Sequence, residues 1–182
     1  MDSPEIHAWQ MDMNREVATL RQIDPHSTAV VSPPLTAGDT PPPTLERLYR
    51  YCGSLTLAGL WNGYFIDSAA RAVTASERGE PSKILFLGGQ MHDVQVFGSD
   101  GGGGRFVVGA ADPKVFYLPS DGAVRDGVYL EEKGILAVEL TTDIDQFMAR
   151  LLEDLRAFVR SDVSHRYLTD VPPSPPSTWF TN

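Results

Sequence analysis

The sequence predicts an α+β fold in a single domain, with a mostly antiparallel sheet packed against helices. Short β-prone runs follow one another about every ten residues through the middle of the chain, without helical patterns between them, which is typical of an antiparallel meander rather than of βαβ units. One long amphipathic pattern follows from Ile144 to Val159, and a helix of this kind covers one face of a sheet.

Proline and glycine divide the chain into three parts. Of the 14 prolines, seven lie at or before Pro43 and four at or after Pro172, whereas all 16 glycines except Gly38 lie between Gly53 and Gly134. Proline marks segments without helix or central strand, and glycine marks tight turns in a folded unit. We therefore expect an N-terminal helix with a Pro-rich linker (residues 1–43), an α+β domain (44–160) and a Pro-rich tail (161–182).

A helix is predicted near the N-terminus. Ser3 suits the N-cap, Pro4 the first helical position and Glu5 the first turn. Apolar residues then recur at spacings of three and four, at Ile6, Trp9, Met13, Val17, Leu20 and Ile23. An isolated helix of this length is marginal in water, so this stripe must be buried. We expect it to dock on its own domain, and pairing with a second copy in a homodimer is the alternative.

Local signals place the next elements. A helix is expected over Thr44–Cys52, with Gly53 in the left-handed position that ends many helices. Asn62-Gly63, flanked by β-prone residues, predicts a hairpin, and Ser68 suits the N-cap of a short helix that runs to about Glu77. The β-prone runs are Ile84–Leu87, Val94–Phe97, Phe106–Val108, Val115–Leu118, Gly127–Leu130 and Ile135–Leu140.

The closing helix has the clearest pattern. Asp143 or Thr142 can cap its start, and Arg156 and Arg160 suit its C-terminal end. Its apolar positions are Ile144, Phe147, Met148, Leu151, Leu152, Leu155, Phe158 and Val159. Core packing accounts for this stripe.

Composition excludes several classes of function. The chain has 15 Lys and Arg against 24 Asp and Glu, a formal net charge of −9, which disfavours sequence-independent binding to nucleic-acid backbones. A single cysteine, Cys52, excludes an internal disulfide and multi-cysteine metal sites. No apolar run approaches the ~18 residues of a membrane span. We expect a soluble, cytoplasmic protein that interacts with neither nucleic acid nor membrane.

The Gly-rich segment from Phe97 to Phe106, FGSDGGGGRF, is the most conspicuous motif. A P-loop would need Lys and Ser/Thr after its last glycine and a helix behind it; here Arg105 and a β-prone run follow. A dinucleotide fingerprint would also lead into a helix. We interpret the segment as a wide turn in which Asp100 bonds local main-chain N–H groups.

No other residues form a catalytic or metal-binding pattern. The register of Cys52 places it on an apolar helix face, where a buried, unreactive thiol is expected. The four histidines, His7, His26, His92 and His165, are scattered along the chain. We therefore expect no enzymatic activity, no catalytic residues, no metal and no cofactor.

Aromatic and charged residues near the predicted hairpins are the candidates for a protein-binding face, because acidic groups beside aromatic rings suit a basic partner. Strand alternation implies that about half of the aromatic rings point into the core instead. The candidate set is Trp61, Tyr64, Asp67, Asp93, Asp100, Arg105 and Tyr129.

The order of these parts resembles the SUKH superfamily of Smi/Knr-type cell-wall regulators and bacterial immunity proteins. The resemblance covers about Leu45 to Val159 and is carried by LWNGYFI at residues 60–66, FGSDGGG followed by RFV at 97–107, VFYLP at 115–119 and the closing helix. It implies a curved, mostly antiparallel sheet packed on helices. The N-terminal helix, the additional glycine and the tail with Trp179 and Phe180 depart from the family pattern.

The resemblance implies a protein-binding function without catalysis. Many members resemble antidotes that bind polymorphic toxins, often nucleases or deaminases. We therefore expect an immunity protein that neutralises a cognate basic toxin by occluding it, and the acidic charge would accelerate that association. The alternatives are a non-catalytic scaffold or regulatory module and, third, a ligand-binding domain or enzyme that uses the Gly-rich loop.

Overall fold

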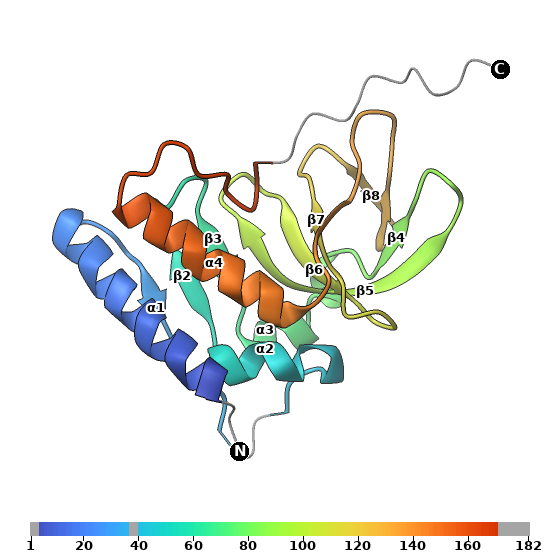
Figure 1. Cartoon of the computed structure of the whole chain (residues 1–182). Helices are drawn as coiled ribbons and strands as arrows, with labels where there is room; N and C mark the ends of the chain where they lie inside the picture. Colours follow the sequence, from blue (N-terminus) through green and yellow to red (C-terminus); the bar gives the residue numbers. More distant parts are fainter. Residues whose placement is uncertain (1–3, 37–39, 171–182) are drawn as a thin grey trace.

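The structure, a computed structural model, describes residues 4–36 and 40–170. In this part of the chain a mixed, mostly antiparallel sheet is packed against helices, which confirms the predicted α+β single-domain fold (Figure 1). Its strands are β1 (Val30–Val31), β2 (Leu55–Leu57), β3 (Tyr64–Ile66), β4 (Lys83–Leu85), β5 (Met91–Asp100), β6 (Arg105–Gly109), β7 (Val115–Leu118), β8 (Ala123–Arg125), β9 (Val128–Leu130) and β10 (Val138–Thr141).

The long strand β5 organises the sheet. Its first residues pair with β4 and its last residues with β3, while β6 pairs along its other edge. Strands β7 and β10 continue antiparallel beyond β6. The pair β4–β9 is parallel, with Lys83 opposite Val128, while the other strand pairs of the described sheet are antiparallel, so the sheet is mostly antiparallel as predicted.

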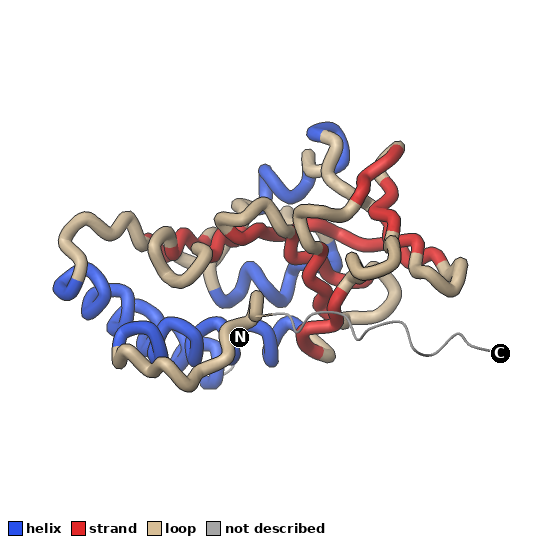
Figure 2. Tube along the Cα trace, turned by 90° about the horizontal axis from the view of Figure 1, so that it is seen from above, coloured by secondary structure: helices blue, strands red, loops and turns tan. Residues whose placement is uncertain are grey.

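The helices are α1 (Pro4–Ile23), α2 (Glu46–Tyr51), α3 (Ala69–Val73) and α4 (Ile144–Val159), with 3-10 turns at Pro43–Leu45 and Ser76–Arg78. Helices α1 and α4 lie side by side, as Figures 1 and 2 both show. Asp143 caps α4 by accepting a hydrogen bond from the N–H of Gln146, and Ser68 caps α3. Both caps confirm the sequence prediction. None of the helices in residues 4–36 and 40–170 is long and apolar enough to cross a membrane.

Helix α1 docks on its own domain. Five residues of its stripe are buried: Ile6, Trp9, Met13, Val17 and Leu20. They belong to the same apolar cluster as Phe147 and Leu151 of α4. Ile23 is the exception, with 61% of its surface exposed. The stripe that could have paired with a second chain is therefore covered within the molecule.

The core does not end at the boundaries expected from proline. Val30–Val31 extends the sheet beside β2, so part of the expected linker is a strand. After α4, Tyr167 and Leu168 return to the main core. Residues 4–36 and 40–170 thus form one unit, and the tail from 171 to 182, with Trp179 and Phe180, lies outside the described residues, as does Ser3.

Two local predictions need correction. Gly53 has no left-handed backbone; an added Cβ there would lie 2.5 Å from the carbonyl oxygen of Pro33, so close approach of two main-chain segments requires this glycine. The hairpin between β2 and β3 exists, but its loop spans residues 58–63 instead of the pair Asn62-Gly63. Within that loop Trp61 has a left-handed backbone, with φ of 50°.

Candidate functional site

Three of the candidate partner-binding residues lie in the core. Tyr64 is 0% exposed, Tyr129 2% and Asp100 5%, so the expectation that they form a binding face is wrong. Tyr64 donates a hydrogen bond to Asp154 at 2.7 Å, and Tyr129 donates to the carbonyl of Pro119. Because internal acceptors satisfy the phenol hydroxyls, these rings can be buried at the positions that strand alternation turns inward.

Asp100 holds the Gly-rich turn together. One carboxylate oxygen accepts a hydrogen bond from the N–H of Gly104 at 2.7 Å, and the other accepts from the hydroxyl of Tyr117, also at 2.7 Å. Residues 101–104 connect β5 to β6. The Gly-rich segment is thus a turn between two strands in which Asp100 accepts a hydrogen bond from a nearby main-chain N–H, which confirms the prediction.

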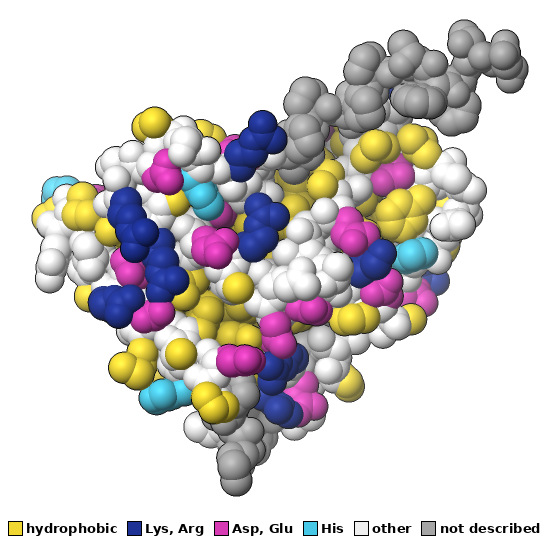
Figure 3. Space-filling view, viewed as in Figure 1, with side chains coloured by type: hydrophobic (Ala, Val, Ile, Leu, Met, Phe, Trp, Pro, Cys, Tyr) yellow, Lys and Arg dark blue, Asp and Glu magenta, His cyan; other side chains and the backbone are white. Residues whose placement is uncertain are grey.

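The charged candidates have separate local partners. Asp67 pairs with Arg71 at 2.9 Å, Arg105 pairs with Glu80 at 2.6 Å, and Asp93 lies 3.7 Å from Lys83. Partial burial raises the pKa of Asp67, and Arg71 opposes that rise. Figure 3 shows acidic and basic side chains interspersed over the face that carries α1 and α4. The structure does not gather these candidates into one acidic patch.

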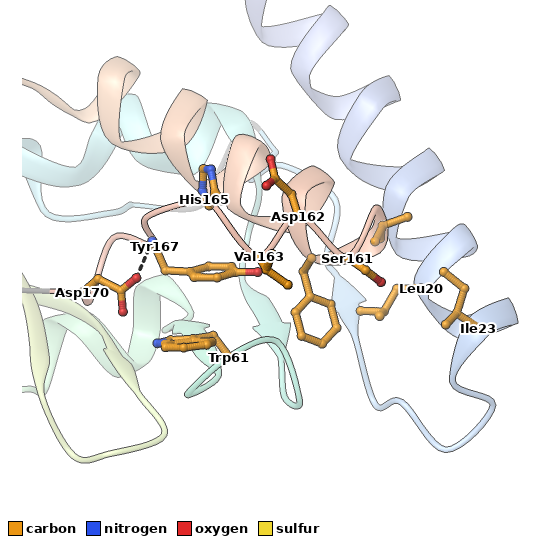
Figure 4. A pocket seen from close by; sticks show the side chains of 11 residues that line it. Leu20, Ile23, Trp61, Ser161, Asp162, Val163, His165, Tyr167 and Asp170 are labelled. Carbon is orange, nitrogen blue, oxygen red and sulfur yellow. Dashed lines mark hydrogen bonds between the residues drawn. The ribbon is translucent and has the colours of Figure 1, made fainter.

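Trp61 is the candidate that the structure places on a distinctive surface. It is 52% exposed, and its indole stacks on the ring of Tyr167 with centroids 4.8 Å apart and an interplanar angle of 8°. The indole of this loop residue thus contacts the segment that follows α4. Figure 4 shows the two parallel rings at one end of a groove.

This groove has a volume of about 580 Å³ and a mostly apolar lining. We call it the Trp61 groove. Its apolar wall comes from the C-terminal ends of two helices, with Leu20 and Ile23 on α1 and Phe158 and Val159 on α4 (Figure 4). Val163, which is 100% exposed, completes the apolar lining beside Trp61 and Tyr167.

A buried carboxylate fixes the other wall of the Trp61 groove. Asp154 of α4 is 1% exposed and accepts hydrogen bonds from the N–H of Leu168 at 2.9 Å and from Tyr64. Its second oxygen lies 2.7 Å from Nε2 of His165. Burial raises the pKa of Asp154, while these hydrogen bonds lower it. The result is a polar attachment of the segment 161–170 to the core.

Sequence reasoning did not find Asp154, His165 or Tyr167. A signal for Asp154 was present, because it falls in the helical register of Phe147, Leu151 and Phe158 on the apolar face of α4. A carboxylate at such a position needs internal partners. No comparable pattern marks Tyr167, whose contact with Trp61 depends on the tertiary fold.

Searches against models of protein families, curated proteins and solved structures found no match. The site is therefore interpreted from its own chemistry. Cys52 is 0% exposed, and burial raises the pKa of its thiol to about 12, as expected for an unreactive thiol. Among the described residues no group of three His, Cys, Asp or Glu side chains is placed to hold a metal ion.

Proposed function

We propose that this chain is a SUKH-like immunity protein that binds and neutralises a basic toxin of the nuclease or deaminase type in the cytoplasm. The observation that supports a binding role is the exposed Trp61, which lines the same groove as the exposed apolar side chains of Ile23 and Val163. Tryptophan contributes more than most residues to protein interfaces, and contiguous exposed apolar surface is typical of interaction sites.

The charge of the chain supports a basic partner. Acidic residues exceed basic ones by 24 to 15, and the excess favours encounter with a positively charged protein over long distances. The resemblance of residues 45–159 to the SUKH superfamily is the reason for proposing a toxin as the partner. Neutralisation then requires no chemistry from this chain, because a bound protein that covers an active site excludes its substrate.

The scaffold alternative would have to use a surface other than the stripe of α1. That stripe lies in the core, with Ile6 and Met13 both 0% exposed, so recruitment through it would require α1 to leave the domain. Exposing several buried large side chains costs several kcal/mol, which makes this route unfavourable.

The proposal is tested by co-expression with the open reading frame adjacent to the gene of this chain. We expect that the neighbouring product arrests growth when expressed alone, that this chain restores growth, and that the purified proteins form a complex whose association rate falls as salt increases. A harmless neighbour, or arrest that this chain does not relieve, would contradict the toxin-neutralising function. An association rate independent of salt would contradict the electrostatic contribution alone.

A further inference from the structure

The Trp61 groove has one open aromatic face. Tyr167 covers one side of the indole by parallel stacking, and about half of the Trp61 surface remains open to solvent (Figure 4). The Nε1–H of Trp61 donates no hydrogen bond to the described residues. One end of the groove therefore carries an exposed indole whose N–H has no hydrogen-bond partner among residues 4–36 and 40–170.

Apart from His165, the charged side chains that line the Trp61 groove are acidic. Its lining contains the carboxylates of Asp162 and Asp170 and no lysine or arginine. Hydrogen bonds from Ser164 lower the pKa of Asp162, so this exposed carboxylate stays ionised at neutral pH. Arg160 and Arg166 are close in sequence and are exposed, but neither side chain belongs to the lining.

We propose that the Trp61 groove binds an extended, proline-containing segment of the partner protein that also carries lysine or arginine. A proline ring packs flat against an open indole, and a polyproline II segment leaves its carbonyl oxygens free to accept from an indole N–H. Ile23, Phe158 and Val159 provide apolar contact for the adjacent side chains, and the carboxylates attract the basic residue. The inference rests on the proposed function and names the surface and segment that it uses.

The fold prepares this groove before any ligand binds. Asp154 and His165 hold the segment that carries Tyr167, and the ring of Tyr167 stacks on the indole of Trp61. A rigid aromatic site loses little conformational freedom on binding, and polyproline II segments are themselves extended in the free state. Both partners therefore avoid much of the usual entropic cost.

The test uses the full chain and two synthetic peptides. In one, the sequence Leu-Pro-Pro-Leu-Pro is flanked by an arginine at each end; in the other, glutamate replaces both arginines. Titration calorimetry should show binding of the arginine peptide, with affinity about tenfold or more above that of the glutamate peptide. No binding of the arginine peptide, or equal affinity for both peptides, overturns the proposal.

Substitutions test whether the arginine peptide binds in the Trp61 groove. Trp61→Ala should lower the affinity for the arginine peptide about tenfold or more, and Asp162→Asn should lower it less while flattening its salt dependence. Ile23→Ser changes an exposed lining residue and removes no core contact. This variant should therefore fold normally and still bind the arginine peptide more weakly. Met11→Ala, at a residue that is 62% exposed outside the groove lining, is the matched control. Unchanged affinity in both Trp61→Ala and Ile23→Ser overturns the proposal.

Two further experiments identify the occupant of the Trp61 groove and its role in neutralisation. The chain has its own proline run, at Pro172, Pro173, Pro175 and Pro176. If the arginine peptide binds only after these prolines are replaced by serine, the chain's own segment is the occupant and the proposal is overturned. If Trp61→Ala relieves growth arrest as fully as the unmodified chain, the groove inference fails while the toxin-neutralising function stands.

Discussion

The indole Nε1 of Trp9 donates a hydrogen bond to the main-chain carbonyl of Met148, 2.7 Å away and 139 positions later in the chain. The bond is buried between α1 and α4, and the same indole contacts the ring of Tyr51 edge-on at 5.3 Å. Arg156 of α4 also pairs with Asp12 and Glu16 of α1. Polar contacts thus fix the register of two helices whose interface is otherwise apolar.

Replacing Trp9 by phenylalanine should therefore destabilise the whole domain. The change removes the donor for a buried carbonyl and part of a buried apolar ring, which together cost about 2–3 kcal/mol. Urea denaturation followed by circular dichroism measures the loss. Met11→Ala, on the exposed side of the same helix, should change the stability by less than about 0.5 kcal/mol. Equal stability of the two variants would show that α1 contributes little to the fold.

Removing the carboxylate of Asp154 should loosen the segment 161–170. Asp154→Ala leaves the donors of Tyr64 and Leu168 without an acceptor, at a cost of about 3 kcal/mol. Asp154→Asn keeps one oxygen for these donors and should cost about 1 kcal/mol. Urea denaturation gives the two losses, and limited proteolysis should cut the alanine variant within 161–170 first. Glu153→Ala, at an exposed neighbour, is the control. If Asp154→Ala resists proteolysis as well as this control does, Asp154 does not attach the segment 161–170 to the core.

Two glycines of the same loop should respond differently to alanine. A Cβ on Gly104 would lie 2.3 Å from the hydroxyl of Tyr117, which is held by Asp100, whereas a Cβ on Gly102 meets nothing closer than 3.5 Å. We expect Gly104→Ala to lower the free energy of unfolding by about 2–3 kcal/mol and Gly102→Ala to leave it nearly unchanged. The thermal midpoints of the two variants provide the measurement. Similar midpoints would mean that the loop adapts without displacing Tyr117.

Stability should fall at alkaline pH. Burial raises the pKa of both Tyr51 and Tyr129 to about 12, and it raises the pKa values of Tyr49, Tyr64 and Tyr117 as well. From about pH 10 the unfolded chain loses phenolic protons that the folded chain retains, so the unfolded state is favoured as pH rises. The stabilisation that the buried phenols contribute is fully present below about pH 9 and is lost as the pH rises through about 12.

Urea midpoints at about pH 8 and about pH 11, with tyrosinate absorbance as a second signal, check this pH dependence. Tyr129→Phe removes one titrating hydroxyl whose hydrogen bond, at 3.4 Å, is long. The difference between the two midpoints should therefore be smaller in this variant. A midpoint that does not change with pH in the unmodified chain would contradict the burial of these phenols.

The parts of the fold that were predictable depend on local patterns. Each apolar position in the closing helix follows from a single period of 3.6 residues, and Ser68 and Asp143 are caps because of their own short side chains. Strand β7 occupies Val115–Leu118, the same residues as its β-prone run. Strand β1 has only two residues and is defined by its pairing with β2, so no local signal could reveal it. The parallel partner of β4 likewise comes from 45 positions away.

The site was less predictable than the fold. Trp61 was identified from its type and its hairpin, but Tyr64, three residues later, is buried because Asp154 on a distant helix accepts its hydroxyl hydrogen bond. A hairpin sequence cannot show whether such an acceptor exists. The Trp61 groove itself requires the C-terminal ends of α1 and α4 to meet the β2–β3 loop, and that meeting is a property of the complete fold.

The partnership of α1 with α4 has a consequence for synthesis on the ribosome. Helix α1 emerges before α4, which begins at Ile144, about 120 residues after the end of α1, a delay of roughly 6–24 s at typical translation rates. During that interval the side chains of Trp9, Met13 and Val17 lack the α4 part of the core that later covers them. The nascent chain should therefore offer an early binding site to chaperones, which disappears once α4 has left the ribosome and packed against α1.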